Sequence, residues 1–195
     1  MSKKGFMSIL EEEIRNCRKC ALWRFRRNPV PGEGCLDASV VFVGEAPGYN
    51  EDLQGRPFVG GAGRLLDKLL SRVGLCREEV YIANVLKCRP PRNRDPKPSE
   101  AEACTPYLDR QIELIRPRLV MTLGRHSSSY VLSKSNIQVR SITRVRGRIF
   151  EVDMSGLEMT VIPTYHPAAA LYNPKYYDML MKDFELLKRE FTRPL

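Results

Sequence analysis

The chain has 195 residues, of which 43% are hydrophobic and 28% are charged, and its formal net charge is +9. These values are typical of a soluble globular protein, and the length suits one domain over residues 1–195 with a sizeable core. No run of about eighteen apolar residues is present, which excludes a transmembrane helix.

Basic residues are concentrated in two parts of the chain. One group is Lys87, Arg89, Arg92, Arg94 and Lys97, and the other is Arg140, Arg144, Arg146 and Arg148. Such concentrations suit contacts with phosphates, so the charge favours an anionic partner, with nucleic acid first. The alternative is a basic surface that is merely solvated, and charge alone does not separate the two.

The first half of the chain predicts two helices and two strands. It begins without the long apolar core of a signal peptide, so we expect an intracellular, cytoplasmic protein. Apolar residues at helical spacing predict one helix containing Phe6, Ile9, Leu10 and Ile14, and another containing Leu65, Leu66, Leu69, Leu70 and Val73 that ends at Gly74. Apolar runs predict buried strands over residues 39–43 and 80–87.

The second half predicts further helices and strands after a basic, proline-rich loop over residues 88–98. Ser99 and Glu102 have the spacing of a capping box, which predicts a helix that ends before Pro117. Strands are predicted over residues 119–123, 148–152 and 158–163, and a short helix over 127–132. Asn173 and Pro174 suit the start of a last helix. Its predicted inward face is Tyr177, Leu180, Phe184, Leu187 and Phe191. This alternation predicts an α/β fold, a mainly parallel sheet with helices on both faces.

The segment from Val40 to Gly63 is the strongest indication of a ligand site. An apolar strand stops there in a long loop of glycines, prolines and acids, and a helical pattern follows. Open α/β sheets bind ligands at the carboxyl ends of their strands, and glycine allows a ligand to approach the backbone closely. We therefore expect a binding pocket at this loop.

Three other residues are candidates for this pocket. Asn84 lies near the end of the second predicted strand, and His166 precedes Pro167, which favours extended backbone at a strand exit. Phe58 lies inside the loop, where an aromatic residue taken alone is more often a lid over the core than a platform for a ligand.

Four of the six cysteines form a pattern typical of a metal site. Cys17 and Cys20 are a C-x2-C pair, and Cys88 and Cys104 flank the proline-rich loop. Four thiolates without a nearby histidine suit either a zinc ion or an iron–sulfur cluster, and buried free thiols are the alternative. Such a site would tie residues 17–20 to residues 88–104. Cys35 and Cys76 lack this context and are expected to be unpaired.

Four motifs together resemble the family 4 uracil-DNA glycosylases, iron–sulfur enzymes known chiefly from thermophilic archaea and bacteria. They are Gly44-Glu-Ala-Pro-Gly48, Gly55-Arg-Pro-Phe-Val-Gly60, Asn84-Val-Leu-Lys-Cys-Arg-Pro-Pro91 and His166-Pro-Ala-Ala169. The resemblance extends from Cys17 to the last helix. It implies a three-layer α/β/α sandwich around a central, mainly parallel four-stranded sheet. It also implies a 4Fe-4S cluster on Cys17, Cys20, Cys88 and Cys104, and a monomer that starts base excision repair on single- or double-stranded DNA containing uracil.

The resemblance implies roles for the pocket residues as well. Phe58 would stack on the uracil ring, and Asn84 would read its Watson–Crick edge. The backbone around Glu45 and Ala46 would contact a uracil carbonyl. His166 would hydrogen-bond the uracil oxygen that gains negative charge as the glycosidic bond breaks.

These roles agree with the chemistry of the residues. A base in duplex DNA must be flipped into a pocket before it can react. An Asn amide offers one donor and one acceptor, which match uracil and leave buried groups unpaired against cytosine. Thymine differs from uracil by a methyl group that only shape can exclude, and Glu51 or Tyr49 is our candidate for that contact.

The catalytic carboxylate is less well defined by the sequence. Cleavage builds positive charge on the sugar, and Glu45 is the carboxylate best placed to stabilise it or to orient water. The alternative for Glu45 is a salt bridge or a loop cap. The best-known uracil glycosylases carry a water-activating Asp where this chain has Ala46, so the water-activating residue stays open.

Two further residues have competing interpretations. His126 follows the third predicted strand, where a cap or surface role is favoured over catalysis. Leu171 is the candidate for a wedge that enters the duplex and fills the gap left by the flipped base; a core leucine is the alternative. No lysine is placed to suggest a Schiff-base step.

Two other functions compete with glycosylase activity. One is a nucleic-acid-binding module with a metal staple and no catalysis. The other is a nucleotide-binding enzyme that uses residues 44–48 as a phosphate loop. This loop lacks the Gly-Lys-Ser/Thr ending of a P-loop and the spacing of the dinucleotide fingerprint, which argues against the second function.

Overall fold

A computed structural model describes residues 2–194, and their strands form one six-stranded sheet in the order β1-β3-β2-β4-β6-β5. The strands are β1 (Glu33–Gly34), β2 (Val40–Gly44), β3 (Tyr81–Asn84), β4 (Leu119–Leu123), β5 (Phe150–Met154) and β6 (Leu157–Thr164). The inner four strands are parallel, whereas β1 and β5 pair antiparallel at the two edges. The expected α/β fold is confirmed, with six strands in place of the four expected.

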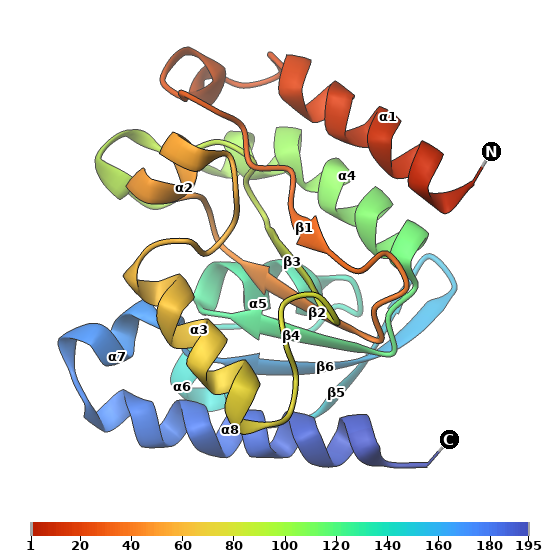
Figure 1. Cartoon of the computed structure of the whole chain (residues 1–195), viewed down its shortest axis with the longest axis vertical. Coiled ribbons are helices and arrows are strands. Elements are labelled where there is room, and N and C mark those ends of the chain that lie inside the picture. The colour runs from red at the N-terminus through yellow and green to blue at the C-terminus, as the bar shows by residue number, and fades with distance from the viewer. Residues whose placement is uncertain (1, 195) are drawn as a thin grey trace.

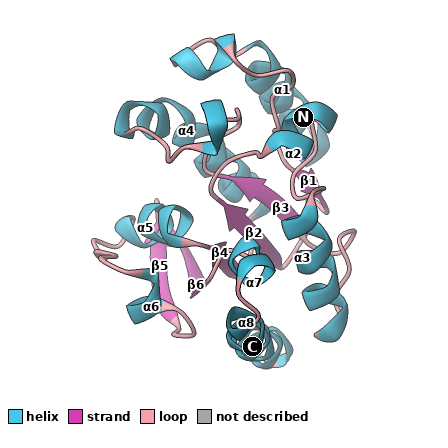
Figure 2. Ribbon diagram, turned by 90° about the vertical axis from the view of Figure 1, so that its left-hand side faces the viewer, coloured by secondary structure: helices cyan, strands magenta, loops and turns pink. Residues whose placement is uncertain are grey.

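Helices cover both faces of the sheet (Figures 1 and 2). On one face lie α1 (Lys3–Asn16), α4 (Pro98–Ile115) and α5 (Arg125–Ser133), and on the other lie α3 (Gly61–Arg72) and α8 (Lys175–Thr192). Three short helices, α2 (Tyr49–Gln54), α6 (Ile142–Val145) and α7 (Ala168–Tyr172), lie in the connections, as do 3-10 turns at Ala21–Arg24 and Pro91–Asn93. Within the described chain, none of the helices is long and apolar enough to cross a membrane.

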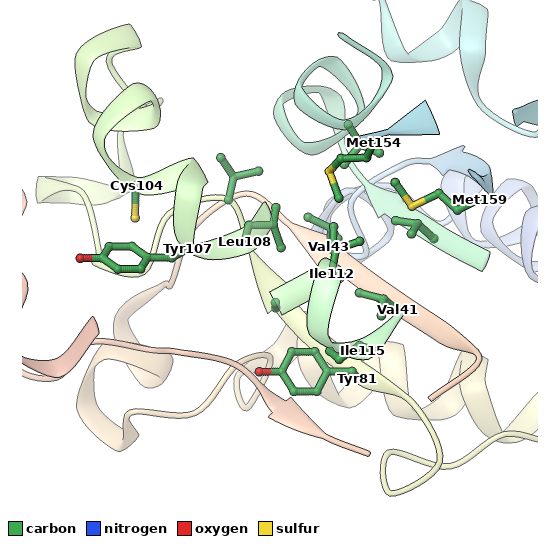
Figure 3. Packing of buried hydrophobic residues seen from close by; sticks show 14 of the residues in the cluster. Val41, Val43, Tyr81, Cys104, Tyr107, Leu108, Ile112, Ile115, Met154 and Met159 are labelled. Carbon is green, nitrogen blue, oxygen red and sulfur yellow. The ribbon is translucent and has the colours of Figure 1, made fainter. Parts of the chain in front are cut away.

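The core has two halves, one on each face of the sheet. Val41 and Val43 of β2 pack with residues of α4 such as Ile112, as Figure 3 shows, while Val40 and Phe42 point to the opposite face. Phe42 stacks on Phe184 of α8 with ring centroids 5.8 Å apart. Because the strand is buried on both faces, it reads as a continuous apolar run rather than an alternating one. Each such buried side chain stabilises the fold by about 1.5–3 kcal/mol.

Two terminal helices differ from expectation in their buried faces. In α1 the buried residues are Met7, Leu10 and Ile14, whereas Phe6 and Ile9 are exposed. The helix is thus turned by about one residue from the predicted face, because Met7 packs on the hydroxyl of Tyr81 at the sheet. In α8, Leu180, Phe184 and Leu187 are buried as predicted. Phe191, predicted to point inward, is partly exposed in the last turn.

Two element boundaries also differ. The start of α4 is Pro98, and the carboxylate of Glu100 accepts the backbone N–H of Lys97 at 2.9 Å. The cap is therefore built two residues earlier than Ser99 and Glu102 predicted. The predicted strand over residues 80–87 is shorter and spans Tyr81–Asn84.

The carboxyl ends of the four parallel strands lie at one edge of the sheet. Gly44 and Asn84 are partners in the register of β2 and β3, and Leu123 and Thr164 are partners in that of β4 and β6. Parallel strands place the residues that follow them at a common edge. Residues from four distant parts of the sequence therefore meet there.

Candidate active site and four-cysteine site

A cavity of about 340 Å³ lies at this edge of the sheet. Its lining includes all six predicted pocket residues: Glu45, Ala46, Glu51, Phe58, Asn84 and His166. A volume of this size is in the range of sites for small ligands, about 300–1,000 Å³. The structure thus brings together side chains that are up to 121 positions apart in the sequence, counted from Glu45 to His166.

Asn84 is the last residue of β3, and its side chain is almost completely buried. Among the buried side-chain nitrogen and oxygen atoms of residues 2–194, only Asn84 Oδ1 has no hydrogen-bond partner. A buried polar atom without a partner costs about 1–3 kcal/mol, so its retention points to a ligand. The amide therefore offers an acceptor into the cavity.

Phe58 is held in the cavity wall by its own backbone and by two glycines. Its φ of 51° is in the left-handed region, which is uncommon for a bulky residue. A Cβ on Gly63 would lie 1.7 Å from the carbonyl oxygen of Phe58. A Cβ on Gly44 would lie 2.3 Å from Asn84 Oδ1 and 2.7 Å from the Phe58 ring. Both glycines are therefore required by close packing around Phe58.

His166 follows β6 and faces Phe58 across the cavity wall. The two rings stack with centroids 5.5 Å apart and planes 25° apart. Nδ1 of His166 accepts the backbone N–H of Ala168 at 3.1 Å. Burial lowers the pKa of His166 to about 4, so the ring is neutral at pH 7. With Nδ1 used as an acceptor, the proton is on Nε2, which is a hydrogen-bond donor.

Glu51 organises the loop that carries Phe58. Its Oε1 accepts the backbone N–H groups of Val59 at 2.9 Å and Gly60 at 2.8 Å. Tyr49, the other candidate for excluding thymine, does not line the cavity and is half exposed. Its ring instead contacts the guanidinium groups of Arg27 and Arg89, whose central carbons are 5.8 and 5.2 Å from its centroid.

Glu45 follows β2 and lies in a charged group at the cavity rim. Nε2 of His126 is 3.8 Å from Glu45 Oε2 and 3.2 Å from Asp95 Oδ2, and Arg125 pairs with Asp95 at 3.1 Å. Burial raises the pKa of Glu45, which the positive charges of His126 and Arg125 oppose and Asp95 reinforces. Glu45 thus lies in the cavity, as predicted, and also has a possible salt-bridge partner in His126, which was the alternative interpretation.

Leu171 is in α7 and is 52% exposed, which excludes the alternative of a core leucine. A Cβ on Gly61, the first residue of α3, would lie 3.1 Å from Leu171 Cδ1. The side chain therefore lies on the surface beside the loop that carries Phe58.

The four predicted cysteines lie around one small internal pocket, which Trp23 and Tyr107 also line. Cys17 caps the end of α1, Cys20 precedes the first 3-10 turn, Cys88 follows β3 and Cys104 is in α4. Cys35 and Cys76 are outside this group, and none of the six cysteines forms a disulfide. Within residues 2–194, no three of the four Sγ atoms all lie within 4.8 Å of one another.

Three N–H groups donate to the sulfur atoms of this site. Arg26 Nη1 donates to Cys88 Sγ at 3.2 Å, the backbone N–H of Lys87 donates to Cys104 Sγ at 3.2 Å, and that of Lys19 donates to Cys17 Sγ at 3.5 Å. Burial raises the pKa of Cys20, Cys88 and Cys104, the last to about 12. Buried thiols with such donors fit thiolate ligands of a metal, because the metal supplies the positive charge that ionisation requires.

Comparison with known proteins identifies the family. A sequence model of the uracil DNA glycosylase superfamily matches residues 31–188. A type-4 uracil-DNA glycosylase from Saccharolobus solfataricus is 53% identical over 187 residues, which are 95% of this chain and 87% of the relative. The chain belongs to the type-4 uracil-DNA glycosylases. A type-4 relative from Thermotoga maritima is 46% identical, covering 88% of this chain and 86% of the relative. A type-5 uracil-DNA glycosylase from Pyrobaculum aerophilum is 31% identical over 80% of this chain and 72% of the relative.

The superfamily match covers every cavity residue of this type-4 uracil-DNA glycosylase and also Cys88 and Cys104, but not Cys17 and Cys20. The match to the Saccharolobus relative is longer than the superfamily match and spans 187 of the 195 residues.

The structure also adds residues that the sequence did not assign to the site. Asn93 and Arg94 line the cavity, and both Arg92 and Asn93 have positive φ. From the sequence, these residues are expected only to be part of a basic loop. No sequence pattern indicates that their backbone turns toward the cavity. His126 was expected to have a cap or surface role; its contact with Glu45 depends on the adjacency of β2 and β4, which one sequence does not reveal.

Several of the basic residues that were expected to contact phosphates are instead buried or paired with acidic residues in this type-4 uracil-DNA glycosylase. Lys87 is fully buried, Arg94 makes two hydrogen bonds to Glu100 at 2.6 and 2.8 Å, and Arg146 pairs with buried Asp183. The basic clusters therefore overstate the free positive surface. Burial lowers the pKa of Lys87 to about 8.

Proposed function

We propose that this protein is a uracil-DNA glycosylase that flips uracil out of DNA and hydrolyses its N-glycosidic bond. The products are free uracil and an abasic site, the first intermediate of base excision repair. The observation that carries this proposal is the buried, unpartnered Oδ1 of Asn84 in the cavity. Uracil offers N3–H to this acceptor and O4 to the Nδ2 donor of the same amide, whereas cytosine offers the opposite pattern.

The remaining uracil contacts follow from the cavity walls. Phe58 supplies a face for stacking, worth about 1–3 kcal/mol, with little selectivity because every base has such a face. The backbone at Glu45 and Ala46 lies at the end of β2, on the cavity. Glu51 fixes the loop on which Phe58 is carried and lines the same cavity, so we assign it, rather than Tyr49, to the contact that excludes the thymine methyl group.

The chemical step uses charge at both ends of the breaking bond. Negative charge develops on the departing uracil, and the Nε2–H of neutral His166 donates to its carbonyl oxygen. Positive charge develops on the sugar, and the carboxylate of Glu45 stabilises it or orients the attacking water. Ala46 offers no polar group to this water, so Glu45 is the ionisable residue of the described lining that we assign to it, with Asn93 as a neighbouring amide.

We also propose that Cys17, Cys20, Cys88 and Cys104 hold a 4Fe-4S cluster that ties residues 17–20 to 88–104 within one domain. A zinc ion bound at about 2.3 Å by four thiolates holds the sulfur atoms only about 3.8 Å apart. The sulfur atoms here are spread more widely, which fits a larger group. Such a cluster supplies cross-linking of two distant segments; the residues of the uracil cavity carry the hydrolysis.

DNA would reach the cavity as a single strand or through a duplex that Leu171 opens. The protein would act as a monomer inside the cell, where DNA is. Its positive charge would favour this encounter at low salt, and added salt would weaken it.

Product analysis tests the proposed reaction. The purified protein is incubated with a strand that carries one deoxyuridine, free base is separated by chromatography, and the strand is then treated with alkali. We expect free uracil and cleavage at the deoxyuridine, with none at deoxycytidine or thymidine in matched strands. Folded protein that releases no uracil would contradict the reaction, and release of thymine at a similar rate would contradict the role of Glu51.

Colour and metal content test the cluster. Protein purified without oxygen should be brown, with about four iron atoms per chain. Replacing Cys104 by Ser should remove the visible absorption, and the matched variant Cys76→Ser, at an exposed thiol outside the group, should retain it. A colourless wild-type protein that contains zinc would contradict the proposal.

A further inference from the structure

Lys87 connects the four-cysteine site to the uracil cavity through hydrogen bonds at both ends of the residue. Its backbone N–H donates to Cys104 Sγ at 3.2 Å, and its side-chain Nζ donates to the backbone carbonyl of Asn84 at 2.9 Å. The side chain is 1% exposed. One residue therefore touches both a proposed cluster ligand and the residue that reads uracil.

The position of this ammonium group is fixed by a chain of buried contacts. Nζ also donates to Gln111 Oε1 at 2.6 Å, and Gln111 Nε2 donates to Pro31 O at 2.8 Å and to the Tyr81 hydroxyl at 3.0 Å. The amide of Gln111 is thus held by three hydrogen bonds. This fixed amide holds the Lys87 side chain in place. Its Nζ therefore bridges Gln111 and the carbonyl of Asn84, the last residue of β3.

The charge of Lys87 has no carboxylate partner. Both acceptors of Nζ are neutral oxygens, and within residues 2–194 Lys87 forms no salt bridge. The nearby carboxylate of Asp109 is bound by Lys134 at 2.7 Å and by the Tyr130 hydroxyl at 2.6 Å. A buried ammonium group is costly unless negative charge faces it. As thiolates, Cys104 and Cys88 would supply negative charge near it, together with Asp109.

Asn84 depends on this arrangement for its orientation. It ends β3, so the sheet holds its backbone from one side only. Val85 N–H and Leu86 N–H extend the pairing with β2 by donating to the carbonyls of Gly44 and Glu45, at 3.0 and 2.9 Å, and Lys87 Nζ binds the carbonyl of Asn84 itself. A shift of that carbonyl would move the amide relative to Phe58.

We propose that Lys87 is a positioning residue whose ammonium group balances the cluster thiolates and, through the Asn84 carbonyl, sets the uracil-reading amide. The proposal rests on the uracil pocket and the cluster proposed above. It assigns the four-cysteine site a part in substrate recognition as well as in stapling the chain. The link is geometric and electrostatic, and no electron transfer to DNA is involved.

The test compares Lys87→Met with Arg26→Met in protein purified with its cluster. Both replacements remove a cation near the cysteines, but Arg26 donates to Cys88 Sγ and to the carbonyl of Arg15, whereas Lys87 Nζ donates to the carbonyl of Asn84. Removing a positive charge beside the cluster makes its reduction harder, so both variants should show a lower reduction potential. Free uracil, used as the probe in calorimetry, should bind about tenfold more weakly to Lys87→Met and unchanged to Arg26→Met.

A third variant covers the case in which Lys87→Met does not accumulate. Lys87→Gln is also neutral, so it should lower the potential, but it keeps a donor near the Asn84 carbonyl and should lose less uracil affinity. Unchanged uracil affinity in Lys87→Met, or an unchanged potential in either Lys87 variant, would overturn the proposal. Wild-type protein that binds its cluster but no uracil would instead contradict the proposed function, and wild-type protein without a cluster would overturn both the proposed cluster and this inference.

Discussion

The imidazole of His166 stacks on the ring of Phe58, although β6 and the loop before α3 deliver these residues from opposite halves of the chain. The stacking sets the plane of the imidazole, and the N–H of Ala168 on Nδ1 sets its rotation. Nε2–H is therefore oriented before any ligand arrives. Donors that are fixed in advance stabilise developing charge without reorganising during the reaction.

Replacing His166 by Gln should separate its part in catalysis from its part in uracil binding. We expect kcat for uracil release to fall about 100- to 1,000-fold, as for loss of one oxyanion donor, while uracil affinity changes much less. Single-turnover rates and calorimetry measure the two effects. Equal losses in kcat and in affinity would contradict a role confined to the transition state.

The low pKa of His166 also makes stability depend on pH. Between its ordinary value near 6.5 and the folded value of about 4, the unfolded chain binds a proton that the folded protein does not. Stability should therefore fall as pH is lowered through this window, and His166→Gln should show a smaller fall. Urea unfolding at pH 7 and pH 5 measures this difference; identical pH dependence in the two proteins would contradict a buried neutral imidazole.

Gly44→Ala should damage the cavity without unfolding the sheet. The new Cβ would lie 2.3 Å from Asn84 Oδ1 and 2.7 Å from the Phe58 ring, so both must move. We expect uracil affinity to fall at least about tenfold, because stacking and the amide contacts are lost together. Circular dichroism checks the fold. Gly74→Ala is the control for backbone strain without a clash, because Gly74 has a φ of 81° and no atom within 4 Å of the added Cβ; it should lose stability and keep its uracil affinity. Normal affinity in a folded Gly44→Ala protein would place uracil elsewhere.

The charged group around Glu45 predicts two pH shifts of opposite sign. If ionised Glu45 carries catalysis, activity falls as pH drops through its raised pKa. His126→Gln removes a positive neighbour and should move this acid limb to higher pH, whereas Asp95→Asn removes a negative neighbour and should move it to lower pH. Asp37→Asn, far from the cavity, is the control. Shifts in the same direction would show that the limb belongs to another group.

Leu171→Ala should affect duplex DNA more than single strands. A wedge is needed only where the flipped base leaves a gap in a stack, so single-stranded deoxyuridine should be processed at nearly the wild-type rate. We expect a loss of about tenfold or more on a U:A duplex. Ile149→Ala changes another exposed aliphatic residue and serves as the control. Equal effects on the two substrates would remove Leu171 from the wedge role.

The sequence predicted the parallel sheet and its long helices because their apolar periods reflect burial on one or two faces. It did not predict α2, α6 and α7, which bury at most one residue each and so leave no period. The edge strand β1 has only two residues and pairs with β3 far along the chain. Its existence depends on a neighbour that local sequence does not reveal.

In the candidate site, too, local sequence patterns predicted some residues, and contacts between distant segments determined the others. Glu45, Asn84 and His166 were expected at strand ends, where the topology of parallel strands alone brings them to one edge. The burial of Lys87 was missed because a lysine within a basic run reads as exposed, and its partners Gln111 and Cys104 come from α4. The contact of His126 with Glu45 was missed for a similar reason, since it depends on strand order.

The most direct test is the rate of uracil release by wild-type protein and by Asn84→Ala on the same single-stranded deoxyuridine substrate. The truncation removes the amide that the cavity aims at uracil and leaves the cluster and DNA surface in place. We predict free uracil from the wild type and a rate about 10- to 100-fold lower from the variant, as for a lost buried hydrogen-bonding pair. Equal rates from two folded proteins, or no release by either, would contradict a uracil pocket built around Asn84.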